Sequence, residues 1–180
     1  FYHPDAPTPD LDKIEVYADH PFQLPEKGVY LSDLEWEKAS CGWSGHEVQK
    51  DHSVYNNTSS LDLGDTIYEK GLGTHAPSEI VYKLEGNYTR FRSLVGVAYN
   101  RRDFDGPNIN VQVYGDDALL FESGEMKGKP YTAPKYINVD VTGVQTLKLV
   151  VDPVGSNSDD WCNFCNAYLI QGTADRTALD

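Results

Sequence analysis

Short stretches in which apolar and polar residues alternate occupy most of the chain between residues 79 and 172. A period of two is typical of β-strands that have one side in a core and the other in water. The pattern predicts strands at residues 79–84, 89–99, 108–117, 118–123, 135–143, 145–152 and 165–172. A helical period never lasts longer than two turns, and residues 31–40 hold at most one short turn.

Gly, Asp and Asn residues separate these stretches, as in the turn EGN at residues 85–87. Such residues favour tight turns, and short strands joined by tight turns are typical of antiparallel sheets. The sequence therefore predicts an all-β fold, an antiparallel β-sandwich or jelly roll. The glycine-rich stretch GLGT at 71–74 is expected as a small-residue turn that leads through His75 into the strand at 79–84.

The length of 180 residues suits one folded domain. Residues 1–28 are rich in proline and acidic residues and are expected as a lead-in segment with one short strand at 13–18. Residues 29–172 are assigned to the sandwich and residues 173–180 to a linker stub. The first residue is Phe rather than Met, so we expect the chain to be cut from a larger protein.

The formal net charge of −13 argues against nucleic acid or an anionic membrane as a partner, because phosphate binding needs clustered Lys and Arg. It is compatible with a neutral ligand. No run of about 18 apolar residues occurs, so no membrane insertion is expected.

The three cysteines are Cys41, Cys162 and Cys165, and the last two form a C-x-x-C motif. Neither a second C-x-x-C nor an H-x-x-H completes a zinc site, and no βαβ pattern points to thioredoxin chemistry. In a strand, side chains three residues apart point to opposite faces, so one of the pair is expected in the core. Pairing of Cys41 with either of them stays open.

Five blocks of sequence resemble the family 51 carbohydrate-binding modules, also called NPCBM domains. They are YLSDLEW (30–36), GWSGHEVQKDHSV (42–54), YEKGLGTHAPSEIVYKLEGNYTRFRSLVGVAY (68–99), VQVYGDDALLFESG (111–124) and DDWCNFCNAYLI (159–170). The resemblance implies a sandwich akin to discoidin and galactose-binding domains, without catalytic residues. It implies a secreted, extracellular or cell-surface bacterial module, covalently linked to the catalytic domain of a glycoside hydrolase.

The ligand that the resemblance implies is terminal galactose or a galactose-containing glycan, such as the blood-group A and B structures. It also implies a structural calcium ion. The chain departs from the family after VGV, where an acidic pair is common and where Ala98 and Tyr99 stand here.

His75 is the first candidate for binding, because in related galactose-binding sandwiches a histidine at the entry to this strand contacts the sugar. Neutral imidazole offers one donor and one acceptor, which suits a hydroxyl group. The alternative is a corner histidine that bonds only to backbone. Trp161 is the candidate platform for the apolar face of galactose, or else a cap on the core. Trp43, the competing platform, is expected in the core.

The loop at residues 99–108 supplies the remaining polar candidates Tyr99, Asn100, Arg101 and Arg102. Arg has a fork of donors for adjacent ring hydroxyls, and Asn has a donor and an acceptor together. Because side chains alternate along a strand, we expect one arginine to face the ligand and choose Arg102. The alternative is a solvated loop tip.

Calcium needs six to eight oxygen ligands, many of them from backbone, and no D-x-D-x-D-G loop occurs. Asp51 and Asn166 are the expected ligands, with the loop DPVGSNSDD at 152–160 as an alternative.

Three functional classes remain. A sugar-binding module leads, and a discoidin-like protein-interaction module is the alternative. A small glycoside hydrolase is third, because no acidic residue has a recognisable acid–base context and neither G-x-S-x-G nor H-E-x-x-H occurs.

Overall fold

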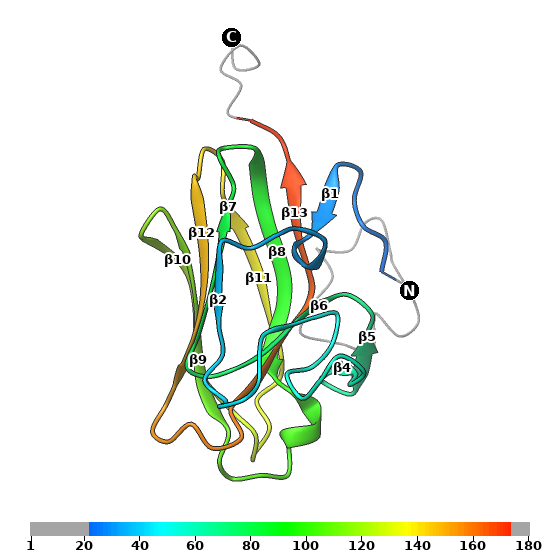
Figure 1. Ribbon diagram of the computed structural model, residues 1–180, viewed down its shortest axis with the longest axis vertical. Helices are drawn as coiled ribbons and strands as arrows, with labels where there is room; N and C mark the ends of the chain where they lie inside the picture. The colour runs from blue at the N-terminus through cyan, green and yellow to red at the C-terminus, as the bar shows by residue number, and fades with distance from the viewer. Residues whose placement is uncertain (1–21, 174–180) are drawn as a thin grey trace, which may run out of the picture.

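The alternating stretches form two antiparallel sheets whose apolar faces pack against each other in the computed structural model (Figure 1). The structure describes residues 22–173, so the strand expected at 13–18 and the stub after residue 173 lie outside the described residues. The first sheet has the order β11-β8-β13-β6-β3, and β1 also pairs with β13. Its strands are β1 (Gly28–Tyr30), β3 (Gln49–Lys50), β6 (Gly71–His75), β8 (Tyr88–Val97), β11 (Lys135–Asp140) and β13 (Trp161–Gln171).

The second sheet has the order β10-β9-β12-β7-β2. Its strands are β2 (Lys38–Ser40), β7 (Ser78–Lys83), β9 (Asn108–Gly115), β10 (Ala118–Lys127) and β12 (Thr146–Pro153). A small hairpin of β4 (Leu61–Leu63) and β5 (Thr66–Tyr68) lies outside the two sheets. The two short 3-10 helices are η1 (Leu31–Asp33), in the stretch expected to hold one turn, and η2 (Tyr99–Arg101).

The core lies between the sheets and follows the period of two read from the sequence. Along β9 and β12 the buried side chains are Ile109, Val111, Val113, Leu147, Leu149 and Val151, and residues between them are partly exposed. The prediction of an all-β antiparallel sandwich is therefore confirmed. Among the described residues, none of the helices has the length and apolar content needed to cross a membrane.

The stretch at 71–74 is a strand and not the expected turn. Gly71 to His75 form β6, which pairs with β13 on one side and β3 on the other. The glycines allow close approach of neighbouring backbone: a Cβ at Gly73 would lie 2.3 Å from the carbonyl oxygen of His52. The chain turns only after His75, at Ala76 and Pro77. Period-two analysis missed β6 because glycines carry no side chain to alternate.

The C-x-x-C cysteines point to opposite faces of β13, as expected. Cys162 lies in the core between the sheets, while Cys165 packs with Leu61 and Leu63 under the β4–β5 hairpin. Burial raises the pKa of both thiols far above the ordinary value. All three cysteines are free thiols, which answers the open pairing of Cys41.

We predict that Gly73→Ala destabilises the fold. The new methyl group must displace backbone atoms of residues 52 and 53 rather than a flexible side chain. Overpacking of this kind costs about 1–3 kcal/mol, which for a domain of this size lowers the melting temperature by roughly 3–10 °C. Thermal unfolding followed by circular dichroism measures the change.

Gly143→Asn is the matched control, because a Cβ there meets no atom within 4 Å and Asn tolerates the left-handed backbone (φ 76°). Equal melting temperatures for Gly73→Ala and the unmodified protein contradict the packing account.

Candidate ligand-binding cavity

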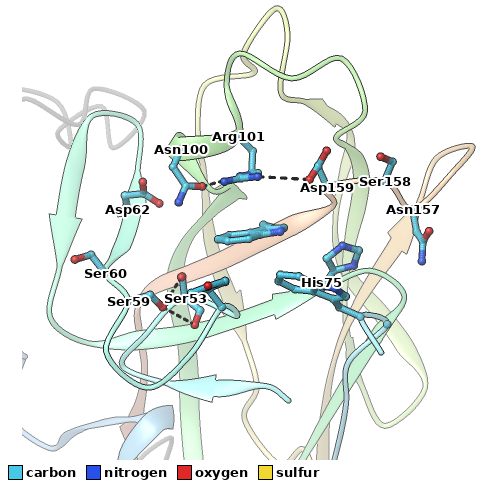
Figure 2. Close-up of a pocket in the computed structure, with 14 residues that line it drawn as sticks. Ser53, Ser59, Ser60, Asp62, His75, Asn100, Arg101, Asn157, Ser158 and Asp159 are labelled. Carbon is cyan, nitrogen blue, oxygen red and sulfur yellow. Dashed lines mark hydrogen bonds and ion pairs between the residues drawn. The ribbon is translucent and has the colours of Figure 1, made fainter. Parts of the chain in front are cut away.

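A cavity of about 690 Å³ opens at the end of the sandwich where β6 ends and β13 begins (Figure 2). The loop before β13 and the turn after β8 lie at this end, opposite the end where β13 finishes (Figure 1). The cavity is lined by residues from five separate segments: Gly42, Trp43, Ser53, Tyr55, Ser59, Ser60, Asp62, His75, Asn100, Arg101, Asn157, Ser158, Asp159 and Trp161. Four residues expected at the site, His75, Asn100, Arg101 and Trp161, are therefore brought together.

Backbone pairing places these four residues. His75 and Trp161 are directly opposite each other in the β6–β13 ladder, so their side chains share one face. The amide of Ala98 donates to the carbonyl of Trp161 at 3.0 Å, which fixes the end of β8 beside the start of β13. Helix η2 follows at once and carries Asn100 and Arg101 to the cavity.

His75 lines the cavity, and its two ring nitrogens have different hydrogen-bonding roles. Its Nδ1 lies 2.7 Å from the carbonyl oxygen of Ala76, and because a carbonyl only accepts, Nδ1 carries the proton. Nε2 of the neutral ring is then an acceptor. The side chain is 6% exposed, and burial lowers its pKa, which favours this neutral form. The bond from Nδ1 to backbone agrees with the hypothesis of a corner histidine and still leaves Nε2 as an acceptor.

Arg101 is held in place by contacts on several sides. Its Nε donates to Asn100 Oδ1 at 3.1 Å, and its Nη1 lies 3.5 Å from Asp159 Oδ1 (Figure 2). The guanidinium carbon lies 4.2 Å from the ring centroid of Trp161 and 4.6 Å from that of Phe104. A guanidinium fixed in this way loses little conformational freedom when a ligand binds.

Tyr99 and Arg102 are not among the residues that line the cavity. Arg102 donates from Nη1 to the carbonyl of Tyr99 at 3.0 Å, and its guanidinium lies over the Tyr99 ring at 4.1 Å. The Tyr99 ring packs edge-on against Tyr131. Strand alternation led to Arg102, but the chain forms a 3-10 helix here, so the alternation ends before the arginines.

Trp161 is 6% exposed and packs with Val54 and Ala98, so the indole caps a small apolar cluster while it lines the cavity. Because Arg101 covers its ring, Trp161 orients the arginine more than it offers an open face. Trp43 was expected in the core, but it is partly exposed and lines the cavity. It stacks on His46 with ring centroids 3.5 Å apart.

Sequence reasoning missed Tyr55, Asp62 and Asp159 as part of the site. Asp62 comes from β4, a strand too short to detect, and burial raises the pKa of its carboxyl although backbone N–H groups of Asn100 and Tyr99 oppose the shift. Asp159 belongs to the loop considered for calcium and instead pairs with Arg101. Nothing local in the sequence distinguishes these residues from solvated loop residues.

Asp160 lies behind the cavity wall and ties the two sheets together. Its Oδ1 accepts from the amide of Asn108 at 2.9 Å, and its carbonyl accepts from the amide of Ala76 at 3.0 Å. The residue is 0% exposed, and Oδ2 has no hydrogen-bond partner within the described part of the chain. Burial raises the pKa of this carboxyl to about 7.

Asp51, one of the two expected calcium ligands, has both carboxylate oxygens bonded to protein groups, and the backbone amide of Asn166, the other, donates to the carbonyl of Lys70 at 2.8 Å. Asp51 Oδ2 accepts from Lys70 Nζ at 2.7 Å and its Oδ1 accepts from the Gly71 amide at 3.1 Å. The same ammonium lies 2.7 Å from Asp33, so lysine already supplies the positive charge here. Residues 22–173 contain no cluster of three or more His, Cys, Asp or Glu suited to a metal. The prediction of a structural calcium ion stays untested.

A family model described as the NPCBM/NEW2 domain matches residues 27–170. The CBM51 module of Clostridium perfringens GH95, solved in complex with methyl-galactose, is 42% identical with a TM-score of 0.71, over 79% of this chain and 99% of that chain. A structure of CBM51-2 in complex with GlcNAc and of the INT domains, from Clostridium perfringens ZmpB, is 34% identical with a TM-score of 0.72. The match covers 83% of this chain and 32% of that chain.

A curated protein named as an endo-α-N-acetylgalactosaminidase of Renibacterium salmoninarum is 32% identical over 152 residues. The alignment covers 81% of this chain and 10% of that protein, so the chain spans about a tenth of the relative's length.

We predict that the stability of Asp160→Asn, measured relative to the unmodified protein, increases as pH rises. The folded carboxyl has a pKa of about 7 against an ordinary value of 3.8, so the folded state holds the proton more tightly. The contribution of Asp160 to stability is therefore full below about pH 4 and is lost as pH rises through 7. Asparagine does not ionise and keeps an oxygen that accepts from Asn108.

Melting temperatures of both proteins at pH 5 and pH 8 measure this effect. The advantage of Asp160→Asn should be larger at pH 8, whereas the exposed Asp117→Asn should show no such change. An advantage that shrinks between pH 5 and pH 8 contradicts the assignment.

Proposed function

The chain belongs to the NPCBM/NEW2 family of carbohydrate-binding modules, and from that premise we propose that its cavity binds a terminal galactose residue. The glycans proposed are galactose-containing structures such as the blood-group A and B antigens. The observation that carries the proposal is the fixed set of donors and acceptors from His75, Asn100, Arg101 and Asp159 at one cavity. The galactoside complex of the GH95 module supports this choice of sugar.

Binding works by hydrogen bonds to neighbouring hydroxyl groups. His75 Nε2 accepts a hydrogen from one hydroxyl, while the Arg101 nitrogen not engaged by Asn100 and Asp159 donates to another. An axial hydroxyl and an equatorial one lie in different places on the ring, so fixed donors and acceptors select between sugar epimers. A site that hydrogen-bonds a hydroxyl strongly rejects an analogue that leaves these groups unpaired.

The apolar face of the sugar packs on aromatic side chains. Trp43 is the platform we propose, because His46 covers one face of its ring and the side chain still borders the cavity. Arg101 covers the Trp161 ring, which therefore acts through the arginine. A few hydrogen bonds worth about 1 kcal/mol each and one stacked ring correspond to millimolar to micromolar affinity.

Attachment to a catalytic domain compensates for weak affinity by raising the effective concentration of the enzyme at a glycan surface. The proposed parent is a secreted bacterial glycoside hydrolase, in keeping with the GH95 module and the Renibacterium salmoninarum relative. Gly28 pairs with Ile170 near the end of β13, whereas Trp161 at the start of that strand lines the cavity. The module itself is proposed to be non-catalytic.

We predict that Arg101→Met lowers the affinity for methyl β-galactoside at least tenfold. Loss of one hydrogen bond from a charged group costs about 1.5–3 kcal/mol, and about 1.4 kcal/mol corresponds to a factor of ten. Isothermal titration calorimetry measures the affinity. Arg102→Met is the matched control, because that side chain contacts Tyr99 and lies outside the cavity lining; its affinity should stay within twofold. A large loss of affinity in Arg102→Met with none in Arg101→Met contradicts the proposed site.

We also predict that galactoside affinity is constant from pH 8 to pH 6.5 and falls at lower pH. The pKa of His75 is lowered below its ordinary value of 6.5, so the neutral ring predominates over the first interval. Protonation at lower pH turns Nε2 into a donor, which cannot accept from the sugar. Titrations at pH 8, 6.5 and 5 test this, with His75→Gln expected to bind weakly and without the decline. Tighter binding at pH 5 contradicts the role given to Nε2.

A further inference from the structure

Resting on the proposed function, we propose that Tyr55 forms an outer subsite that contacts the second sugar ring of a bound glycan. Tyr55 therefore determines the preference for a galactose-terminated disaccharide over a single galactoside. The inner groups of the cavity hold the terminal ring, and the exposed side of Tyr55 contacts the second ring.

Tyr55 differs from the other aromatic side chains of the cavity in its exposure. It is 55% exposed, whereas Trp161 is buried and Trp43 is partly buried. The large apolar or aromatic side chains exposed in residues 22–173 are Tyr55, Ile67, Phe104 and Leu119. Of these four, Tyr55 alone lines the cavity. An isolated exposed apolar residue is ordinary, but one at the border of a polar cavity extends the binding surface.

The inner side of the Tyr55 ring is packed and its outer side is open. Its centroid lies 6.2 Å from that of Trp161 with an angle of 17° between the rings, and 6.3 Å from that of Trp43. These contacts turn the ring toward the inner aromatic cluster. A pyranose attached to the terminal sugar would meet the exposed side, where its apolar C–H groups can pack on the ring.

Hydrogen bonds hold the loop that carries Tyr55 in one conformation. Ser53 Oγ donates to Ser59 Oγ at 2.7 Å, and the ring of His52 donates to the Ser59 carbonyl at 2.9 Å. Within the turn, the Thr58 amide donates to Asn56 Oδ1 at 2.9 Å. The loop is therefore closed at its base and at its tip. A preformed aromatic surface adds to affinity because little ordering free energy is lost on binding.

The size of the cavity fits a ligand longer than one sugar. Its volume of about 690 Å³ is in the middle of the range of roughly 300–1,000 Å³ for pockets that enclose drug-sized ligands. Ser59 and Ser60 follow Tyr55 in the same loop, and all three residues line the wall of the cavity. This wall thus combines one aromatic surface with hydroxyl groups, the combination that a second pyranose requires.

The test compares a monosaccharide with disaccharides on matched variants. Affinities for methyl β-galactoside and for the Galβ1-4, Galβ1-3 and Galα1-3 disaccharides are measured by calorimetry on the unmodified protein and on Tyr55→Ala. Tyr55→Phe retains the ring, and Leu119→Ala removes an equally exposed apolar side chain (51%) from β10. Melting temperatures verify that each variant is folded.

We expect the unmodified protein to prefer at least one disaccharide over methyl β-galactoside by about five- to tenfold. Tyr55→Ala should reduce this ratio to below twofold, because the disaccharides lose more affinity than methyl β-galactoside does. Tyr55→Phe and Leu119→Ala should keep the ratio.

Two results overturn the outer subsite while leaving the proposed function intact: no disaccharide preference in the unmodified protein, or equal losses for monosaccharide and disaccharides in Tyr55→Ala. Absence of any galactoside binding by the folded unmodified protein instead overturns the proposed function, and the subsite with it.

Discussion

The antiparallel pairing of β6 with β13 is the contact on which the rest of the cavity depends. It places His75 opposite Trp161, and the start of β13 then fixes the end of β8 through the bond from the Ala98 amide. On β6 itself, the segment that follows β3 leaves so little space that glycine is needed at residue 73, beneath the backbone of residues 52 and 53. The loop that carries Tyr55 is thereby pressed against the strand that carries His75.

Burial fixes the protonation state or the contacts of the polar groups around this pairing. His75 is neutral with its proton on Nδ1, Arg101 is fixed between Trp161 and Phe104, and Asp160 joins the two sheets behind the wall. A chain with a net charge of −13 thus places one arginine, already paired with Asp159, at its proposed sugar site. That balance suits neutral hydroxyl groups better than an anionic ligand.

Lys70 links η1, β3 and β6 where these three elements meet. The ammonium of Lys70 lies between Asp33 and Asp51 and brings together segments distant in sequence. Its pKa is raised by the two carboxylates despite the opposing effect of burial, and that of Asp51 is lowered by Lys70 and neighbouring donors against the same effect. This internal ion pair gives Asp51 a structural role that its sequence context did not indicate.

The sequence by itself determined the sandwich, because period-two alternation records which side of each long strand faces the core. It also indicated His75, Asn100, Arg101 and Trp161, since the family resemblance and strand ends mark loop-bearing positions. It could not decide which of Arg101 and Arg102 lines the cavity. The chain forms a 3-10 helix from Tyr99, so the alternation of a strand does not extend to the arginines. Nor could it identify Trp43, Tyr55, Asp62 and Asp159, which meet at the cavity from separate segments. Such residues become neighbours only through backbone pairing and close packing between distant parts of the chain. The tertiary structure alone decides which distant parts pair and pack.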